Sequence, residues 1–260
     1  MKTSITSVKK LMGKKRIIRI LAAAFWILIW QIASIWLKQE ILLASPVSVI
    51  KRLGELVFTA DFWLSAGFSF VRIVLGFLLG LAAGILLAVI SCAFAAAAVL
   101  FDPLITVIKS TPVASFIILC LIWIPSRNLS VFISFLMVLP VVYTNILEGI
   151  RQTDRQLLEM ADVFSVSWGR RILYIYVSQV MPYFLTGCRL SLGLCWKAGV
   201  AAEVIGVPSG SMGEKLYHAK IYLNTPDLFA WTIVIILISF LFEKFFLDVV
   251  KKLMGILERR

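Results

Sequence analysis

The chain has 260 residues, of which 61% are hydrophobic and 15% are charged. Soluble domains contain roughly 45–50% apolar and about 25% charged residues, so this chain has too few polar side chains to cover a water-facing surface. Its composition excludes a soluble globule, a disordered chain and a coiled coil, and indicates an integral membrane protein. The net charge of +12 is then explained by Lys and Arg in cytoplasmic loops rather than by nucleic-acid binding.

Six apolar stretches are long enough to cross a bilayer, whose hydrocarbon core of about 30 Å requires about 20 residues per helix. The predicted spans are residues 18–36, 66–90, 103–124, 129–150, 178–202 and 228–248. A polar break at residues 125–128 is all that separates the third span from the fourth, so we expect these two to form a hairpin. The sequence therefore predicts an all-α transmembrane protein, a six-helix polytopic bundle.

Basic residues predict the orientation of these spans. Residues 1–19 contain seven Lys or Arg and no acid, and further basic residues follow the fourth and sixth spans. Because cytoplasmic loops collect Lys and Arg, we expect both termini in the cytoplasm and a multi-pass protein of the plasma or inner membrane. A signal peptide is the alternative for the N-terminus, but the apolar run is too long and no clean cleavage site follows it.

Small residues and prolines mark special positions in the spans. Gly76, Gly80 and Gly84 lie four residues apart in the second span, a spacing that lets helix backbones approach closely. We favour packing within the chain over contact with a second copy. Pro112 and Pro182 interrupt the third and fifth spans, where a bend could serve as a gate or only as an aid to packing.

The polar segment 151–171 predicts a short amphipathic helix projecting into the cytoplasm. Thr153 and Gln156 fit a capping box at its start, and Arg155 and Glu159 can pair across one turn. Its apolar residues recur at helical spacing: Leu157, Leu158, Ala161 and Phe164. Two acids on the polar face make an anionic membrane a poor partner, so a partner protein is favoured over a helix that lies on lipid headgroups.

Three charged residues belong to the fifth predicted span or its edge. Arg189 and Lys197 lie inside it, and Glu203 lies near its outer end. A charge at mid-bilayer costs roughly 2.5–3.5 kcal/mol on insertion scales, so such residues usually face a bundle interior or water. Two interpretations stay open: the basic residues lower the barrier for an anion that crosses a pore, or they snorkel or pair with Glu203.

The cytoplasmic segment resembles the loop of ABC importer permeases of the binding-protein-dependent type. The family pattern is Glu-Ala-Ala, three residues, Gly, nine residues, Ile, one residue, Leu-Pro. Glu159, Ala161 and Ile175 match it in register. Four positions depart from it: Met160 stands for the first Ala, Ser165 for the Gly, Val177 for the Leu and Ser178 for the Pro.

The resemblance extends over roughly residues 40–250. Residues 72–84 look like the second span of the family, and residues 101–112 are similar to its Pro-kinked third span. Ala202, Glu203 and Gly206 look like the Ala-Glu-x-x-Gly segment that follows its fifth span. Residues 213–229 are most similar to the nitrate/sulfonate/taurine branch.

The resemblance implies a type I ABC importer permease, a pore subunit for a small anion such as a sulfonate, taurine or nitrate. The implied partners are two cytoplasmic ABC ATPase subunits, an extracytoplasmic solute-binding protein, membrane lipid and a second permease copy, without nucleic acid. The loop 153–170 would couple to the ATPase through Leu158, Glu159, Met160, Ala161, Asp162, Phe164 and Ser165. The implied organisation is a basic cytoplasmic N-terminus at 1–17, a permease domain at 18–250 with its coupling loop at 151–171, and a basic tail at 251–260.

Other function classes find little support in the residues. The chain has no GxxxxGK[ST] phosphate loop, so ATP hydrolysis is expected in a separate subunit. Four cysteines without a CxxC pair and a single histidine predict no metal site, cofactor or catalytic centre. A self-contained secondary transporter or channel is the main alternative, but it would typically carry acids inside its spans, and Asp102 and Glu148 lie at span ends.

Overall fold

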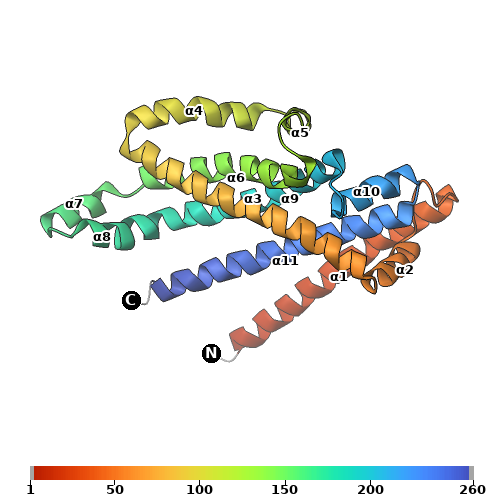
Figure 1. The fold of residues 1–260 in the computed structure, drawn as a ribbon. Helices are drawn as coiled ribbons and strands as arrows, with labels where there is room; N and C mark the ends of the chain where they lie inside the picture. Colours follow the sequence, from red (N-terminus) through yellow and green to blue (C-terminus); the bar gives the residue numbers. More distant parts are fainter. Residues whose placement is uncertain (1–2, 258–260) are drawn as a thin grey trace.

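The computed structural model describes the backbone of residues 3–257 and the side chains of residues 17, 18 and 20–255. The predicted segment 1–17 and the end of the tail 251–260 therefore lie largely outside the described side chains. The described residues form helices and no strand, so the all-α prediction is confirmed (Figure 1). The helices are α1 (Thr3–Leu37), α2 (Pro46–Val57), α3 (Ala60–Ala93), α4 (Ala95–Ser110), α5 (Val113–Cys120), α6 (Ser126–Arg151), α7 (Arg155–Val163), α8 (Trp168–Arg171), a π-helical turn (Ile172–Tyr176), α9 (Val177–Gly206), α10 (Met212–Ile221) and α11 (Thr225–Leu257).

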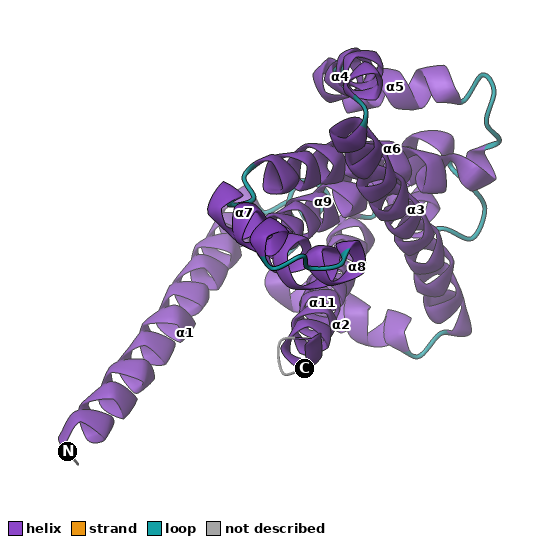
Figure 2. Ribbon diagram, turned by 90° about the vertical axis from the view of Figure 1, so that its left-hand side faces the viewer, coloured by secondary structure: helices purple, strands orange, loops and turns teal. Residues whose placement is uncertain are grey.

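Helices α3, α6 and α9 form the centre of the molecule, and α11 runs beside them (Figure 1). Helix α7 and both ends of the described chain lie at one end of the bundle, whereas α2 and α10 lie at the other. Helix α1 stands away from the bundle in both views (Figures 1 and 2). It is held near its end by Trp30, whose Nε1 donates to the Ala44 carbonyl at 3.0 Å.

Three glycines allow α3 and α6 to pack backbone against backbone. A Cβ on Gly76 would lie 2.3 Å from the Val131 carbonyl oxygen, and one on Gly80 would lie 2.8 Å from that of Phe135. A Cβ on Gly84 would lie 2.8 Å from the Cβ of Val142. Because all three glycines face α6 of the same chain, the prediction of contact within the chain is confirmed.

The third predicted span is two helices rather than one. Helices α4 and α5 are bent by 104° at a break that contains Pro112. A proline disfavours helical geometry at the residue before it, and Thr111 accordingly adopts extended backbone at the end of α4. Together the two helices form an arm outside the α3–α6 pair (Figure 1). Pro112 thus lies at a real bend, whereas Pro182 lies within α9.

Three described helices are apolar and long enough to cross a membrane: Ile20–Leu37 of α1, α3 and α6. The bent pair α4 and α5 would provide a fourth crossing if it counts as one span. The predicted fifth and sixth spans fall within α9 and α11, which are 30 and 33 residues long and carry several charged side chains. The count of six spans therefore stays a prediction.

A short helix occupies the polar loop as predicted, but its N-cap differs from the predicted one. Asp154 caps α7, and its Oδ1 accepts from the backbone N–H of Gln156 at 2.8 Å. Thr153 is buried, and its hydroxyl donates to the Gly149 carbonyl of α6 at 3.3 Å. The capping-box prediction was wrong because Thr153 still belongs to the last turn of α6, where its N–H donates to the Ile150 carbonyl at 3.3 Å. The next residue, Asp154, is therefore the one that caps α7.

Helix α7 ends in a Schellman turn. The N–H of Val166 donates to the Ala161 carbonyl at 2.9 Å, and the N–H of Ser165 donates to that of Asp162 at 3.0 Å. Ser165 takes the left-handed conformation that this turn requires, with φ of 49°. Ser165 stands where the family pattern has Gly, so a glycine-like backbone is kept although the side chain is not.

Substitution of Gly76 by Ala should destabilise the protein. The added methyl group would overlap the Val131 carbonyl, and overpacking of this kind costs about 1–3 kcal/mol. Gly67→Ala on the same helix is the matched control, because a Cβ there meets nothing within 4 Å. Thermal unfolding in detergent checks both variants, and equal unfolding temperatures would contradict the packing described above.

Substitution of Ser165 by Gly should stabilise the end of α7. A non-glycine residue in the left-handed region costs roughly 1–2 kcal/mol, so the variant should slow amide exchange at residues 164–166 about 5- to 30-fold. Ser165→Val should accelerate it, because β-branched residues tolerate this conformation least. Faster exchange in Ser165→Gly than in the unchanged protein would be evidence against the turn.

Candidate functional site

The surface of α7 combines acids with exposed apolar side chains. Ala161 is buried within the chain, and Leu157 and Leu158 are half-buried. Val163 is 81% exposed and Phe164 is 73% exposed. Glu159, Met160, Asp162 and Trp168 are exposed as well, and so is Arg155 at the start of the helix. Exposed apolar side chains gathered at one place mark an interaction site.

The ion pairs around α7 differ from the expected ones. The described residues show no ion pair between Arg155 and Glu159. Instead, Arg171 Nη2 lies 2.6 Å from Asp162 Oδ1 and ties α8 to α7. Among the described residues, Glu159 has no ion-pair partner. Trp168, which sequence reasoning missed, was identifiable as the one tryptophan of the segment 151–171.

Arg189 and Lys197 lie together on one exposed stripe of α9. Thr186 and Gly193 are exposed on the same stripe, and the spacing of three to four residues returns these positions to one helix face. Both charged side chains face away from α3 and α6, since the α9 residues that contact those helices are buried. Because a charge facing hydrocarbon is costly, this stripe requires water or another protein surface beside it.

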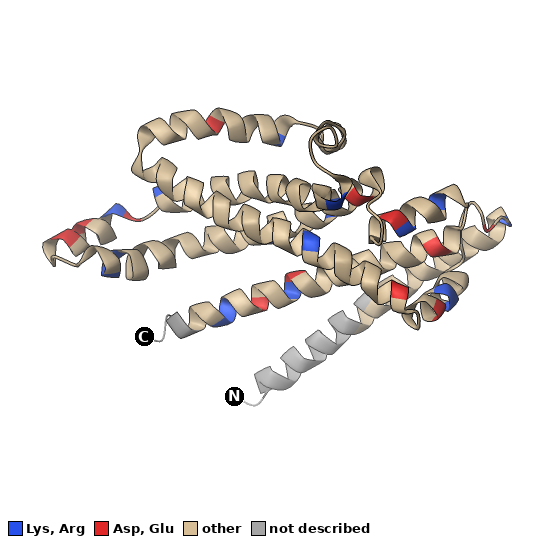
Figure 3. Ribbon diagram, in the orientation of Figure 1, with Lys and Arg blue, Asp and Glu red and all other residues tan. Residues whose placement is uncertain are grey.

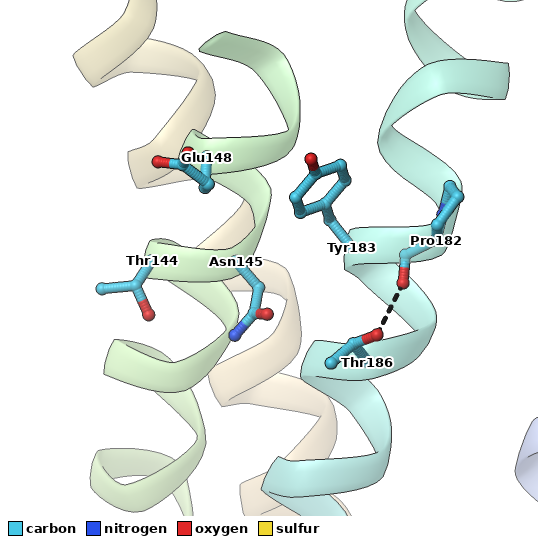
Figure 4. Close-up of a pocket in the computed structure, with 6 residues that line it drawn as sticks. All are labelled: Thr144, Asn145, Glu148, Pro182, Tyr183 and Thr186. Atoms are coloured by element: carbon cyan, nitrogen blue, oxygen red, sulfur yellow. Dashed lines mark hydrogen bonds between the residues drawn. The ribbon is translucent and has the colours of Figure 1, made fainter. Parts of the chain in front are cut away.

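A polar pocket of about 540 Å³ continues the stripe toward the α7 end of the bundle. Its walls come from α6 and α9, and Figure 4 shows the lining residues: Thr144, Asn145, Glu148, Pro182, Tyr183 and Thr186. The Thr186 hydroxyl donates to the Pro182 carbonyl at 2.8 Å. Sequence reasoning missed Thr144, Asn145 and Tyr183, although two adjacent polar residues inside an apolar span were a usable signal.

Glu203 does not share this exposed stripe. It is 0% exposed, and its Oε2 accepts from the Ser69 hydroxyl of α3 at 2.6 Å and from the Gly213 N–H of α10 at 3.3 Å. In this conformation it joins three helices and pairs with neither Arg189 nor Lys197.

Charged side chains attach the short helices α2 and α10 to the long helices at the end of the bundle opposite α7 (Figure 3). Arg52 of α2 donates two hydrogen bonds to Asp227 of α11, one of them at 3.2 Å, and one to Glu55 at 2.9 Å. The hydrogen bonds to Asp227 and then to Glu55 raise the pKa of the Arg52 guanidinium above its usual value. Lys215 of α10 lies 2.6 Å from Asp61 of α3. These contacts hold α2 and α10 in place.

The described residues contain no cluster of His, Cys, Asp or Glu that could hold a metal ion. The four cysteines are free, and Cys92 is the exposed one among them.

Curated relatives align with the chain over most of their length. An aliphatic sulfonates transport permease protein, SsuC, of Bacillus subtilis is 28% identical over 94% of this chain and 90% of the relative. The taurine transport system permease protein TauC of Escherichia coli is 24% identical over 82% of this chain and 80% of the relative. The nitrate import permease protein NrtB of Synechococcus elongatus is 27% identical over 70% of this chain and 69% of the relative.

A solved structure shares the fold. The crystal structure of an amino acid ABC transporter with histidines superposes with a TM-score of 0.58 at 19% identity, covering 80% of this chain and 97% of that one. Residues 80–254 match the family of binding-protein-dependent transport system inner membrane components. This match spans more than half of the chain, and it confirms the resemblance found in the loop and at residues 202–206. The chain belongs to this family, the membrane-embedded permease components of ABC transporters.

Proposed function

We propose that the chain is the pore subunit of an ATP-driven importer for a small anion, and that α7 is the helix through which a separate ATPase drives it. The exposed surface of α7 carries this proposal. Glu159, Met160 and Phe164 are exposed, and α7 lies in a loop that extends beyond the rest of the bundle (Figure 1). Exposed apolar side chains beside an unpaired carboxylate suit a cleft in a protein better than lipid headgroups.

The two sides of the protein follow from its charges. Basic residues gather in the first half of α1 and at Lys251 and Lys252 of α11. The start of α1 and the end of α11 share one end of the bundle with α7 (Figure 1). By the positive-inside rule this end is cytoplasmic, so α7 meets a cytoplasmic ATPase. Helices α2 and α10 then face outward, toward a solute-binding protein.

The α9 stripe supports an anion path between two copies of the chain. Arg189 and Lys197 are exposed on a helix of membrane-spanning length, and a second copy could bury that face while water keeps both charges hydrated. The relatives named for sulfonates, taurine and nitrate share oxyanion solutes. Positive charge along the path lowers the barrier for such a group. Glu203 lies on the side of α9 that contacts α3 and α10, and it holds α9 in place behind the path.

A self-contained secondary transporter or channel is the second candidate, since Glu203 is an acid within the helical bundle. The two candidates differ in a simple assay. In proteoliposomes the importer needs ATPase subunits and ATP for uptake, and the permease alone hydrolyses no ATP. Uptake by the permease alone, driven by a proton or sodium gradient, would replace the importer proposal with the secondary transporter.

Glu159→Lys should abolish ATP-dependent uptake and leave the protein in the membrane. The reversed charge removes the carboxylate offered to the ATPase, and hydrogen bonds to charged groups contribute about 1.5–3 kcal/mol each. Glu40→Lys is the matched control, because Glu40 is also exposed but lies between α1 and α2, at the opposite end. Radiolabelled uptake and co-purification of the ATPase check both variants. Normal uptake by Glu159→Lys would remove the coupling role of α7.

Lys197→Gln and Arg189→Gln should each slow anion uptake about tenfold, equivalent to a barrier raised by ~1.4 kcal/mol. The amides keep most of the side-chain volume but lose the charge. Arg189→Lys serves as the control that retains it, and Lys38→Gln as a control outside the stripe. Initial uptake rates check the series. Equal rates in all four variants would exclude the stripe from the path.

A further inference from the structure

The first turn of α10 is hydrogen-bonded to the buried carboxylate of Glu203, directly and through Ser69. The Met212 N–H donates to the Ser69 hydroxyl oxygen at 2.9 Å, and that hydroxyl donates to Glu203 Oε2 at 2.6 Å. The Gly213 N–H donates to the same carboxylate oxygen at 3.3 Å. The first turn of α10 is thus attached to α3 and α9 through Ser69 and Glu203.

This attachment is closely fitted. Ser69, Glu203 and Met212 are each 0% exposed. A Cβ on Gly213 would lie 2.3 Å from the Cβ of Glu203, so only glycine lets α10 approach this far. A carboxylate at a helix N-terminus is stabilised by the free N–H groups and the helix dipole. The fit fixes where α10 begins.

The other side of the carboxylate is unsatisfied. Glu203 Oε1 is buried without a hydrogen-bond partner, and so are the Ser130 hydroxyl of α6 and Nη1 of Arg72 of α3. Ser130 follows Leu129 of α6, which packs against α9 where a Cβ on Gly206 would lie 2.9 Å from the Leu129 Cδ2. Arg72 lies three residues after Ser69 on α3, so the two share a helix face. Both groups are donors, and a buried unsatisfied donor or acceptor is costly. The unused oxygen Oε1 of Glu203 therefore has two candidate donors besides the groups that hold Oε2.

The connection from α9 to α10 is strained in this arrangement. Val207, the residue after α9, has φ of 45°. A β-branched residue in the left-handed region is an outlier, and such strain persists only where the surrounding contacts enforce it. Release of α10 from Glu203 would let this residue relax.

We propose that Glu203 is a positioning residue in a two-position latch on the outer end of the permease. In the closed position it holds Ser69 and the first turn of α10. In the open position it turns to Ser130 and Arg72 and frees α10. The latch rests on the proposed function: α10 lies at the end that faces the solute-binding protein, and Glu203 lies on the helix that carries Arg189 and Lys197. Binding of the solute-binding protein at α10 is thereby linked to the position of α9, the helix that lines the anion path.

The test uses the reconstituted importer, with its ATPase subunits and binding protein, and two serine variants of α3. Ser69→Ala removes the hydroxyl that joins α10 to Glu203. It should raise ATP hydrolysis in the absence of binding protein about tenfold, because a hydrogen bond to a charged group is lost from the closed position only. Ser65→Ala is the matched control, since Ser65 is equally buried one turn away but makes no hydrogen bond. It should leave the rate unchanged.

Arg72→Gln should act in the opposite direction, because it weakens the open position. Uptake should fall about tenfold without a rise in basal hydrolysis. A purely structural role for these residues would lower uptake and thermal stability together in both Ser69→Ala and Arg72→Gln, and would not move their basal hydrolysis in different directions.

A crosslink tests the motion without touching the buried groups. The side chains of Asp61 and Lys215 form an ion pair at 2.6 Å. The double variant Asp61→Cys and Lys215→Cys can therefore be crosslinked by a short reducible linker. The exposed Cys92 is first removed by Cys92→Ser. Uptake should stop on crosslinking and return on reduction. Unchanged uptake in the crosslinked protein, or equal hydrolysis by Ser69→Ala and Ser65→Ala, overturns the latch. Absence of ATP-dependent uptake by the unmodified complex would overturn the proposed function, and with it the role of the latch in transport.

Discussion

The contact between α3 and α6 is the constraint on which the rest of the structure depends. Gly76, Gly80 and Gly84 bring the two backbones together over two turns, so these helices can neither slide nor separate without losing that fit. A membrane supplies little hydrophobic force between helices, and close backbone packing takes its place. Helix α9 then packs on the pair with Gly199, where a Cβ would lie 2.6 Å from the Ser134 hydroxyl.

The positions of the charged side chains on α9 follow from this packing. Because apolar side chains fill the core around these close contacts, the charged residues of α9 are confined to its free face or to its outer end. Arg189 and Lys197 occupy the free face, and Glu203 is enclosed at the junction with α3 and α10. The same helix thus offers a charged stripe on one side and a buried carboxylate on the other.

The sequence predicted the all-α class, the loop helix and the glycine contact, because each depends on local spacing. Helical periodicity is enough to find α7, and glycines four residues apart are enough to predict a close helix pair. It did not predict the 104° bend between α4 and α5 as two separate helices, because a proline announces a break but not its angle. Asp154 replaced Thr153 as the cap because the last turn of α6 still includes Thr153, and the length of α6 cannot be read from the local pattern.

The candidate site was only partly accessible from the sequence. Hydropathy identified Arg189, Lys197 and Glu203 as unusual, but not that the first two face outward and the third faces inward. Helix phase separates them: residues 189 and 197 are eight apart and share a face, whereas residue 203 is six further on and faces elsewhere. The polar pocket of Thr144, Asn145 and Tyr183 required the position of α6 against α9, which no local pattern contains.

The π-helical turn before α9 has a mechanical consequence. Residues 168–206 run through α8, the turn and α9 without a break, a rod of roughly 58 Å at 1.5 Å per residue. Arg171 of this segment is paired with Asp162 of α7. Arg189 and Glu203 are therefore both joined to the loop helix through one ion pair and one continuous run of helical backbone, with no flexible loop between them.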